Sequence, residues 1–168
     1  MLEHWSLVKF VLVTLAMKIG ALDDDGLDLL FTRGNHKEEG IKGSHIRSKF
    51  DAAMSNVAAS DELQASRSHL LLPAQMTSAL SQILADYHSN TSKKLTIIVL
   101  TTGMWEHEED SEDVEELLAR EIGNMAKDPS FRKQRRLTIE FVSFGEYEEG
   151  LTRLKNLDDN FSAKYRIP

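Results

Sequence analysis

The 168-residue chain contains no cysteine. This absence excludes disulfide bonds, thiolate metal sites and cysteine nucleophiles, and it fits a reducing compartment. Basic residues are in deficit as well, because 20 lysines and arginines stand against 27 aspartates and glutamates and give a net charge of −7. Nucleic-acid-binding proteins use a basic surface to neutralise phosphates, so this balance argues against nucleic acid as a partner.

The apolar run near the start of the chain covers only residues 10–17, whereas a membrane-spanning helix needs about 20 apolar residues. We therefore expect no membrane span. A stripe at helical spacing predicts an amphipathic helix with one face in the core: Trp5, Val8, Leu12, Leu15 and Ile19. The alternative is that residues 1–21 act as a signal peptide and the chain is secreted, although no basic segment opens them. We favour the helix, and with it a cytoplasmic protein.

Known catalytic and ligand-binding sequence motifs are missing too. The chain has no glycine-rich phosphate loop, no dinucleotide-binding fingerprint and no nucleophile elbow. His107-Glu108 begins like a zinc-protease helix, but Ser111 stands where the second histidine is required. The six histidines are scattered without a persuasive ligand spacing, and the acidic run 106–116 lacks the alternating ligands and glycine of a calcium loop. We predict no catalytic residue and no metal ligand.

Strand and helix patterns alternate along the chain. Apolar, β-branched runs predict strands at 27–32, 94–101 and 137–144, and residues 33–44 read as a loop. Helical spacing marks residues 45–59, a helix opening at Pro73, one after the acidic run and one after Gly145. Such alternation is typical of an α/β fold in which helices cover a mostly parallel sheet. We expect a single domain over residues 1–168.

Three segments together carry a family resemblance. They are His4-Trp5 with residues 22–32 (LDDDGLDLLFT), residues 97–106 (IIVLTTGMWE), and residues 139–145 (IEFVSFG) with 150–159 (GLTRLKNLDD). In this order they resemble von Willebrand factor A (vWA) domains, in particular a fungal, intracellular group. The resemblance implies a three-layer, Rossmann-like sheet flanked by helices.

The resemblance also implies a metal site at the carboxyl ends of the strands, where ligands gather in open sheets. In the family this site takes an Asp-x-Ser-x-Ser motif from the first strand, a loop threonine, and an aspartate after the fourth strand. Here the first strand would precede Met1, the threonine falls near Ala74, and Thr102 replaces the aspartate. Magnesium demands near-octahedral oxygen coordination. We therefore expect no cofactor, and no magnesium in particular.

The missing first strand has a second implication. In the family it lies between the strands that we place at 27–32 and 95–101, so these would pair directly or leave backbone groups unpaired. An open sheet edge invites another chain, which makes self-association through that edge an expected contact. The family's last strand is also absent, so we expect a domain that is incomplete at both ends.

The leading hypothesis is a non-enzymatic, metal-independent module that binds another protein at the carboxyl ends of the strands. The predicted contact residues are Thr101, Thr102, Gly103, Trp105 and Glu106. An exposed tryptophan is a common binding anchor, and a ring folded back over the following helix start is the alternative. Two rival hypotheses are a truncated, nonfunctional or chain-pairing fragment, and an enzyme that uses a doubly wound sheet to handle a phosphorylated or nucleotide ligand.

Overall fold

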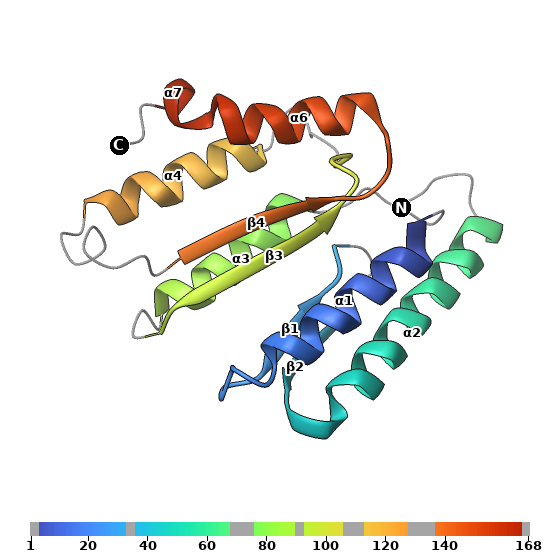
Figure 1. Cartoon of the computed structure of the whole chain (residues 1–168). Coiled ribbons are helices and arrows are strands. Elements are labelled where there is room, and N and C mark those ends of the chain that lie inside the picture. The colour runs from blue at the N-terminus through green and yellow to red at the C-terminus, as the bar shows by residue number, and fades with distance from the viewer. Residues whose placement is uncertain are drawn as a thin grey trace. The chain divides into compact units, whose positions relative to one another are not determined.

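The computed structural model describes residues 4–32, 36–67, 76–89, 93–105, 113–127 and 137–165, with the side chains of the second helix described as far as residue 58 (Figure 1). The chain divides into two compact units, Met1–Ala74 and Gln75–Pro168. The architecture is mixed α/β, as predicted. Within the described residues, each unit carries one two-stranded sheet, which is antiparallel in unit 1 and parallel in unit 2.

Unit 1 is a helix, a β-hairpin and a second helix. The elements are α1 (Trp5–Ile19), β1 (Leu27–Leu30), β2 (Lys37–Ile41), the short 3-10 helix η2 (Gly43–His45) and α2 (Ile46–Arg67). β1 pairs antiparallel with β2, with Leu27 opposite Ile41 and Leu30 opposite Lys37. The ladder is irregular between Leu27 and Leu29, and there the Gly40 N–H donates to Asp28 Oδ1 over 2.7 Å.

The loop predicted over residues 33–44 is wrong for residues 37–41, which form β2. Four of the five residues in this strand are exposed, and only Ile41 is buried. A strand that is held by backbone pairing and buries one side chain carries no alternating apolar pattern, so it has no strand signal in the sequence. Its charged side chains are typical of an edge strand.

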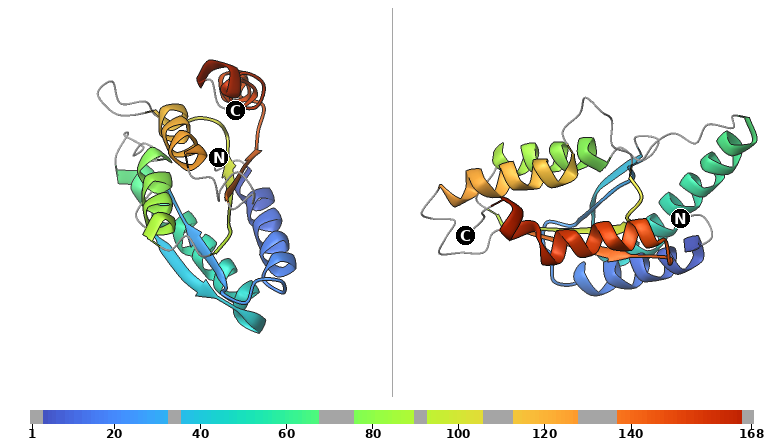
Figure 2. Two further views of the ribbon diagram at one scale, coloured as in Figure 1. Left: turned by 90° about the vertical axis from the view of Figure 1, so that its left-hand side faces the viewer. Right: turned by 90° about the horizontal axis from the view of Figure 1, so that it is seen from above.

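The core of unit 1 lies between the hairpin and the two helices. Its buried members are Ala16, Leu29, Ile41, Ile46, Phe50 and Ala53. α1 runs beside α2 (Figures 1 and 2), and Val8 on its predicted stripe is buried, while the other members of that stripe are half-buried. The helix predicted from residues 5 to 19 is confirmed. Among the described residues, no helix is both long enough and apolar enough to cross a membrane.

Unit 2 alternates helices and strands. The elements are α3 (Met76–Ser89), β3 (Leu95–Thr101), α4 (Val114–Ala126), β4 (Leu137–Ser143), α6 (Glu148–Asp159) and α7 (Phe161–Tyr165). β3 and β4 pair in parallel, from Leu95 opposite Leu137 to Thr101 opposite Ser143. The two strands and the helices after them are confirmed, but Pro73, the predicted start of α3, lies outside the described residues.

The helices of unit 2 bury apolar faces and have favourable starts. α3 buries Met76, Leu80, Leu84 and Tyr87, and α4 buries mainly Val114, Leu117, Leu118 and Met125. Asp113 caps α4, because its Oδ1 accepts a hydrogen bond of 2.6 Å from the Val114 N–H, and Glu115 and Glu116 follow in the first turn. Carboxylates at this end are favoured by the helix dipole. The end of the acidic run is therefore a helix start, as predicted.

Removing the cap should weaken α4. We expect Asp113→Ala to lower the free energy of unfolding by about 1 kcal/mol, because an N-terminal N–H loses its acceptor. Urea denaturation followed by far-UV circular dichroism measures this change. Asp113→Asn is the matched control, since asparagine caps equally well. An equal loss in both variants would show that the cap contributes nothing through its hydrogen bond.

Candidate functional site

The predicted binding loop leaves the carboxyl end of β3, beside the carboxyl end of β4. Parallel pairing continues one step past β4, because the Phe144 N–H donates to the Thr101 carbonyl oxygen over 2.8 Å. Ligand sites in open α/β sheets gather at this edge. Four of the predicted contact residues, Thr101, Thr102, Gly103 and Trp105, lie here in the described structure. Glu106 and Ala74 lie outside the described residues.

A side chain closes the turn that follows β3. Thr101 Oγ1 accepts a hydrogen bond of 3.0 Å from the Gly103 N–H, and Gly103 takes a φ of 75°. That conformation is open to glycine at little cost and strained for other residues. Thr101 and Thr102 are both buried, so the two threonines form the base of the loop and not its outer surface.

The loop touches the first turn of α6 through two glycines. A Cβ on Gly103 would lie 2.6 Å from the Gly150 Cα and overlap its carbonyl group. A Cβ on Gly150 would overlap the carbonyl oxygen of Thr102. Only two residues without side chains allow this approach, so the pair fixes the position of α6 against the loop.

Trp105 is packed inside unit 2, with 5% of its surface exposed. Its ring lies 6.1 Å from the Phe141 ring of β4, and the Arg153 guanidinium carbon of α6 lies 5.1 Å from its centroid. Arg153 Nη1 also donates to the carbonyl oxygens of Trp105 (2.9 Å) and Gly103 (3.4 Å). The prediction that the Trp105 side chain is exposed is therefore wrong. The ring folds back, but onto β4 and α6, because stacking on the guanidinium and on Phe141 buries its large apolar surface.

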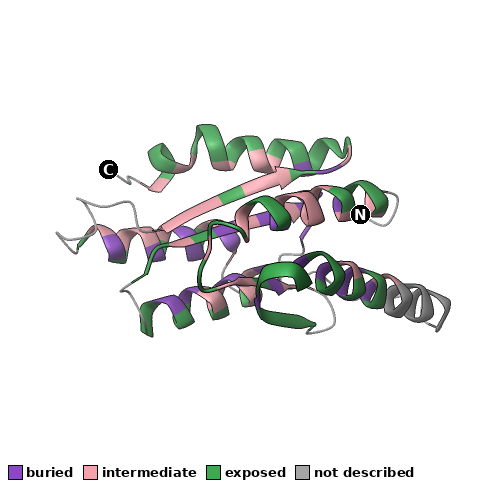
Figure 3. Ribbon diagram, turned by 60° about the horizontal axis from the view of Figure 1, so that its bottom comes forward, coloured by how far each residue is buried: buried purple, intermediate pink, exposed green. Residues whose placement is uncertain are grey.

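In the described part of the loop, the exposed side chain is Met104, a residue that was not among the predicted contacts. It has 44% of its surface exposed, and two residues at the start of α6 have similar values, Tyr147 with 41% and Leu151 with 43%. Met104 directly follows Gly103 and Leu151 directly follows Gly150, so the glycine contact brings the backbone at these two positions near one another. We call Met104, Tyr147 and Leu151 the Met104 patch. Figure 3 shows that most of α6 is exposed.

The indole Nε1 of Trp105 is buried and has no acceptor in the described part of the chain. An unpaired buried donor costs about 1–3 kcal/mol. The stacking on Arg153 and Phe141 has to offset this penalty for the ring to stay folded in. This conflict was not visible in the sequence, because it depends on contacts with residues 141 and 153.

The described part of the loop, residues 102–105, offers few metal ligands. Within the described residues, no three histidine, aspartate or glutamate side chains gather into a group that could hold a metal ion. The Thr101 hydroxyl is engaged by Gly103, and Thr102 brings one neutral hydroxyl. That donor set does not fit magnesium, which binds through carboxylates and several further oxygens.

A cluster of three polar side chains, His88, Arg120 and Glu121, lies where α3 meets α4. The spacing of these residues in the sequence did not predict it. His88 Nε2 lies 2.6 Å from Glu121 Oε2, and Arg120 Nε donates to Glu121 Oε1 over 3.0 Å. Burial raises the pKa of Glu121, but hydrogen bonds and charges from His88 and Arg120 outweigh it and hold the pKa below its usual value. The contact of His88 with Glu121 links the two helices, so we interpret this pair as a clamp between α3 and α4.

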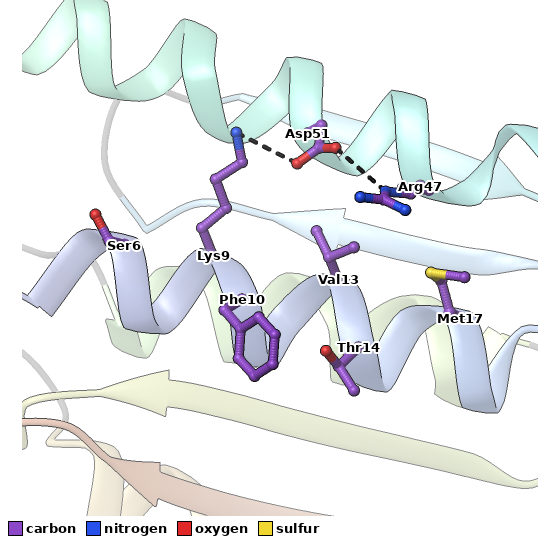
Figure 4. Close-up of a pocket in the computed structure, with 8 residues that line it drawn as sticks. All are labelled: Ser6, Lys9, Phe10, Val13, Thr14, Met17, Arg47 and Asp51. Atoms are coloured by element: carbon purple, nitrogen blue, oxygen red, sulfur yellow. Dashed lines mark ion pairs between the residues drawn. The ribbon is translucent and has the colours of Figure 1, made fainter.

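A shallow groove of about 370 Å³ lies along α1 in unit 1 (Figure 4). Asp51 of α2 forms ion pairs with Lys9 (3.3 Å) and Arg47 (3.9 Å) at its edge. Phe10 points away from these charges, as Figure 4 shows, and is largely exposed. The full lining is Ser6, Lys9, Phe10, Val13, Thr14, Met17, Arg47 and Asp51. The charged groups face one another and leave no converging polar set for a small ligand among these lining residues.

Comparison with protein-family models, with curated proteins and with solved structures found no match to this chain. The contacts of the loop after β3 are therefore the basis of the proposed function.

A side chain at Gly150 should destabilise the folded chain, because it would fill the space between Gly150 and the loop. We expect Gly150→Ala to lower the free energy of unfolding by about 1–3 kcal/mol, because the new methyl group overlaps the Thr102 carbonyl. Gly123→Ala is the control. A methyl group on Gly123, inside α4, meets no atom within 4 Å, so it should stabilise the helix by about 0.5–1 kcal/mol. Urea denaturation of both variants gives the values. A neutral Gly150→Ala would mean that the loop moves away freely.

The Glu121 clamp should make stability depend on pH. Because its pKa is lowered in the folded chain, its contribution is present above the unfolded-state pKa of about 4.3 and is lost as the pH falls through the folded-state pKa. The free energy of unfolding of the wild type should therefore approach that of Glu121→Gln as the pH is lowered from about 6 to about 3. Denaturation at several pH values measures both. A constant gap across this range would contradict the clamp.

Proposed function

We propose that the chain is a non-enzymatic protein-binding module of the vWA type, and that it binds its partner without a metal ion. The Met104 patch carries the proposal, because it is an apolar surface whose loop is held by the glycine contact and by Arg153. Exposed apolar residues that lie together mark interaction surfaces. A loop that is already ordered loses little conformational entropy on binding.

The predicted contact residues take different parts in this proposal. Met104 contacts the partner directly, while Thr101, Thr102 and Gly103 shape the turn beneath it. Trp105 anchors the loop from inside, since its ring contacts the Phe141 ring and the Arg153 guanidinium. Glu106 remains a proposed contact because it follows Trp105 in the sequence.

The proposal includes one domain over residues 1–168 with the three-layer, Rossmann-like sheet that the vWA resemblance implies. The parallel pairing of β3 with β4, and the helices that alternate with them, support this architecture. A second copy pairing along an open sheet edge is a further proposed contact. We propose a cytoplasmic location, because the chain lacks cysteine and because α1 contributes to a packed core.

Site-specific cross-linking tests the proposal. A photoreactive amino acid at Met104 should give a discrete protein adduct in a lysate of the source cells. Excess unlabelled chain should suppress this adduct, and chelator should leave it unchanged. The partner is identified by mass spectrometry, and binding is then measured with the purified protein.

The matched control carries the same photoreactive group at Asn124, an exposed residue near the end of α4. The same adducts at both positions would reject the Met104 patch as the binding surface. Loss of the adduct in chelator would reject metal independence. Saturable binding of a nucleotide to the purified chain would favour the enzyme alternative, and the absence of a cooperative thermal melt would favour the fragment alternative.

A further inference from the structure

Helix α1 of unit 1 has an exposed apolar side. Eleven of its 15 residues are apolar, and a helix that is apolar on all sides is normally buried on all sides. In this structure one side of α1 faces the core through Val8 and Ala16, which are buried. Phe10 has 68% of its surface exposed, and Leu7 and Met17 are more than half exposed. The composition of α1 therefore calls for a second cover, on the side of these three residues.

The exposed side has the spacing by which two helices pack along their length. Leu7, Phe10, Thr14 and Met17 are separated by three, four and three positions, so they form one stripe on the helix surface. We call these four residues the α1 stripe. Figure 4 shows Phe10 and Thr14 on the same side of the helix, and the shallow groove runs beside them. A straight stripe next to a shallow groove fits another helix.

The α1 stripe is complementary to itself when two copies of α1 run antiparallel. A two-fold axis at the middle of the stripe places Leu7 of one copy against Met17 of the other. The same axis places Phe10 against Thr14, so the largest side chain of the stripe faces the smallest, and facing layers of this kind fill space evenly. A parallel pair would place Phe10 against Phe10 and Thr14 against Thr14, and the two layers would then differ in volume.

We infer that the α1 stripe is a dimerisation surface, which binds the α1 stripe of a second copy of this chain in the antiparallel direction. Lys18 of one copy then lies opposite Ser6 of the other, so like charges do not meet. The same surface serves both copies, so the assembly closes at two. One pair of 15-residue helices makes a small interface, and we expect a reversible dimer with a micromolar dissociation constant. The inference does not depend on the Met104 patch, which belongs to unit 2.

The charges near α1 argue against a membrane surface as the cover. Helices that lie on a membrane carry a polar face rich in lysine and arginine. α1 has only two lysines, and Lys9 already forms an ion pair with Asp51 over 3.3 Å. Three aspartates, residues 23–25, follow the helix closely in the sequence, and anionic headgroups would repel them. A second copy of α1 meets the apolar stripe without this repulsion.

Analytical ultracentrifugation of the full chain over a range of concentrations tests the inference. The wild type should pass from monomer to dimer in the micromolar range, with little dependence on salt because the contact is apolar. Phe10→Glu should weaken the dimer about tenfold or more, because the contact would bury an unpaired carboxylate. The matched control is Leu22→Glu, which places the same charge at a residue that is 87% exposed and lies beyond the stripe. It should dimerise like the wild type, and both variants should keep the wild-type thermal melt.

Disulfide trapping tests the direction of the two helices, because the chain has no cysteine of its own. Leu7→Cys and Met17→Cys are prepared as two proteins of different mass, mixed and oxidised. Antiparallel pairing should give mainly the mixed disulfide. In that arrangement two copies of the same position stand about 15 Å apart along the helix axis, which is too far for a disulfide, whose Cα atoms lie within about 7 Å of each other.

Several results would overturn the inference. These are a wild type that stays monomeric at millimolar concentration, a dimer that persists unchanged in Phe10→Glu, an equal loss in Leu22→Glu, and disulfides that join mainly identical positions. Binding of the wild type to phosphatidylcholine or phosphatidylserine vesicles, without any dimer and lost in Phe10→Glu, would assign the stripe to a membrane instead. Cross-linking at Met104 is a separate test, so its failure would reject the proposed function and leave the dimer standing.

Discussion

The backbone contact between Gly103 and Gly150 is the constraint on which the surface of unit 2 depends. It joins the turn after β3 to the first turn of α6, two segments that are distant in the sequence but that follow neighbouring parallel strands. With that contact in place, Arg153 reaches the carbonyl oxygens of the loop and the ring of Trp105. Exposed apolar residues stand on either side of the contact, Met104 on the loop and Leu151 on α6.

Two neighbouring residues of the loop have different roles. Trp105 packs inward and supports the backbone, and Met104 is exposed and available to a partner. The larger aromatic side chain turns inward and orders the backbone, although its Nε1 has no acceptor in the described residues. The flexible methionine beside it stays exposed. Methionine adapts to irregular partner surfaces because it is unbranched and polarisable. A rigid backbone that carries an adaptable side chain suits a binding surface.

Sequence patterns predicted the elements that bury apolar faces, such as β3 and α4, and they placed the candidate loop at the end of a buried strand. β2 was missed because backbone pairing with β1 holds it while most of its side chains stay exposed. The orientation of Trp105 was missed as well, because it depends on Phe141 and Arg153. The contact of His88 with Glu121 likewise joins residues 33 positions apart. Such pairings arise from tertiary packing, which no local pattern records.

The two strand pairings also imply an order of folding. β1 and β2 meet through a short hairpin, which closes in about 1–10 μs. β3 meets β4 only after the chain between Thr101 and Leu137 has been looped out, and such non-local parallel pairing is slow. The glycine contact needs both strands and α6 in place, so it belongs to the late steps. Until then the apolar side chains of β3 and β4 remain open to other chains, and in this interval unit 2 is most prone to aggregate.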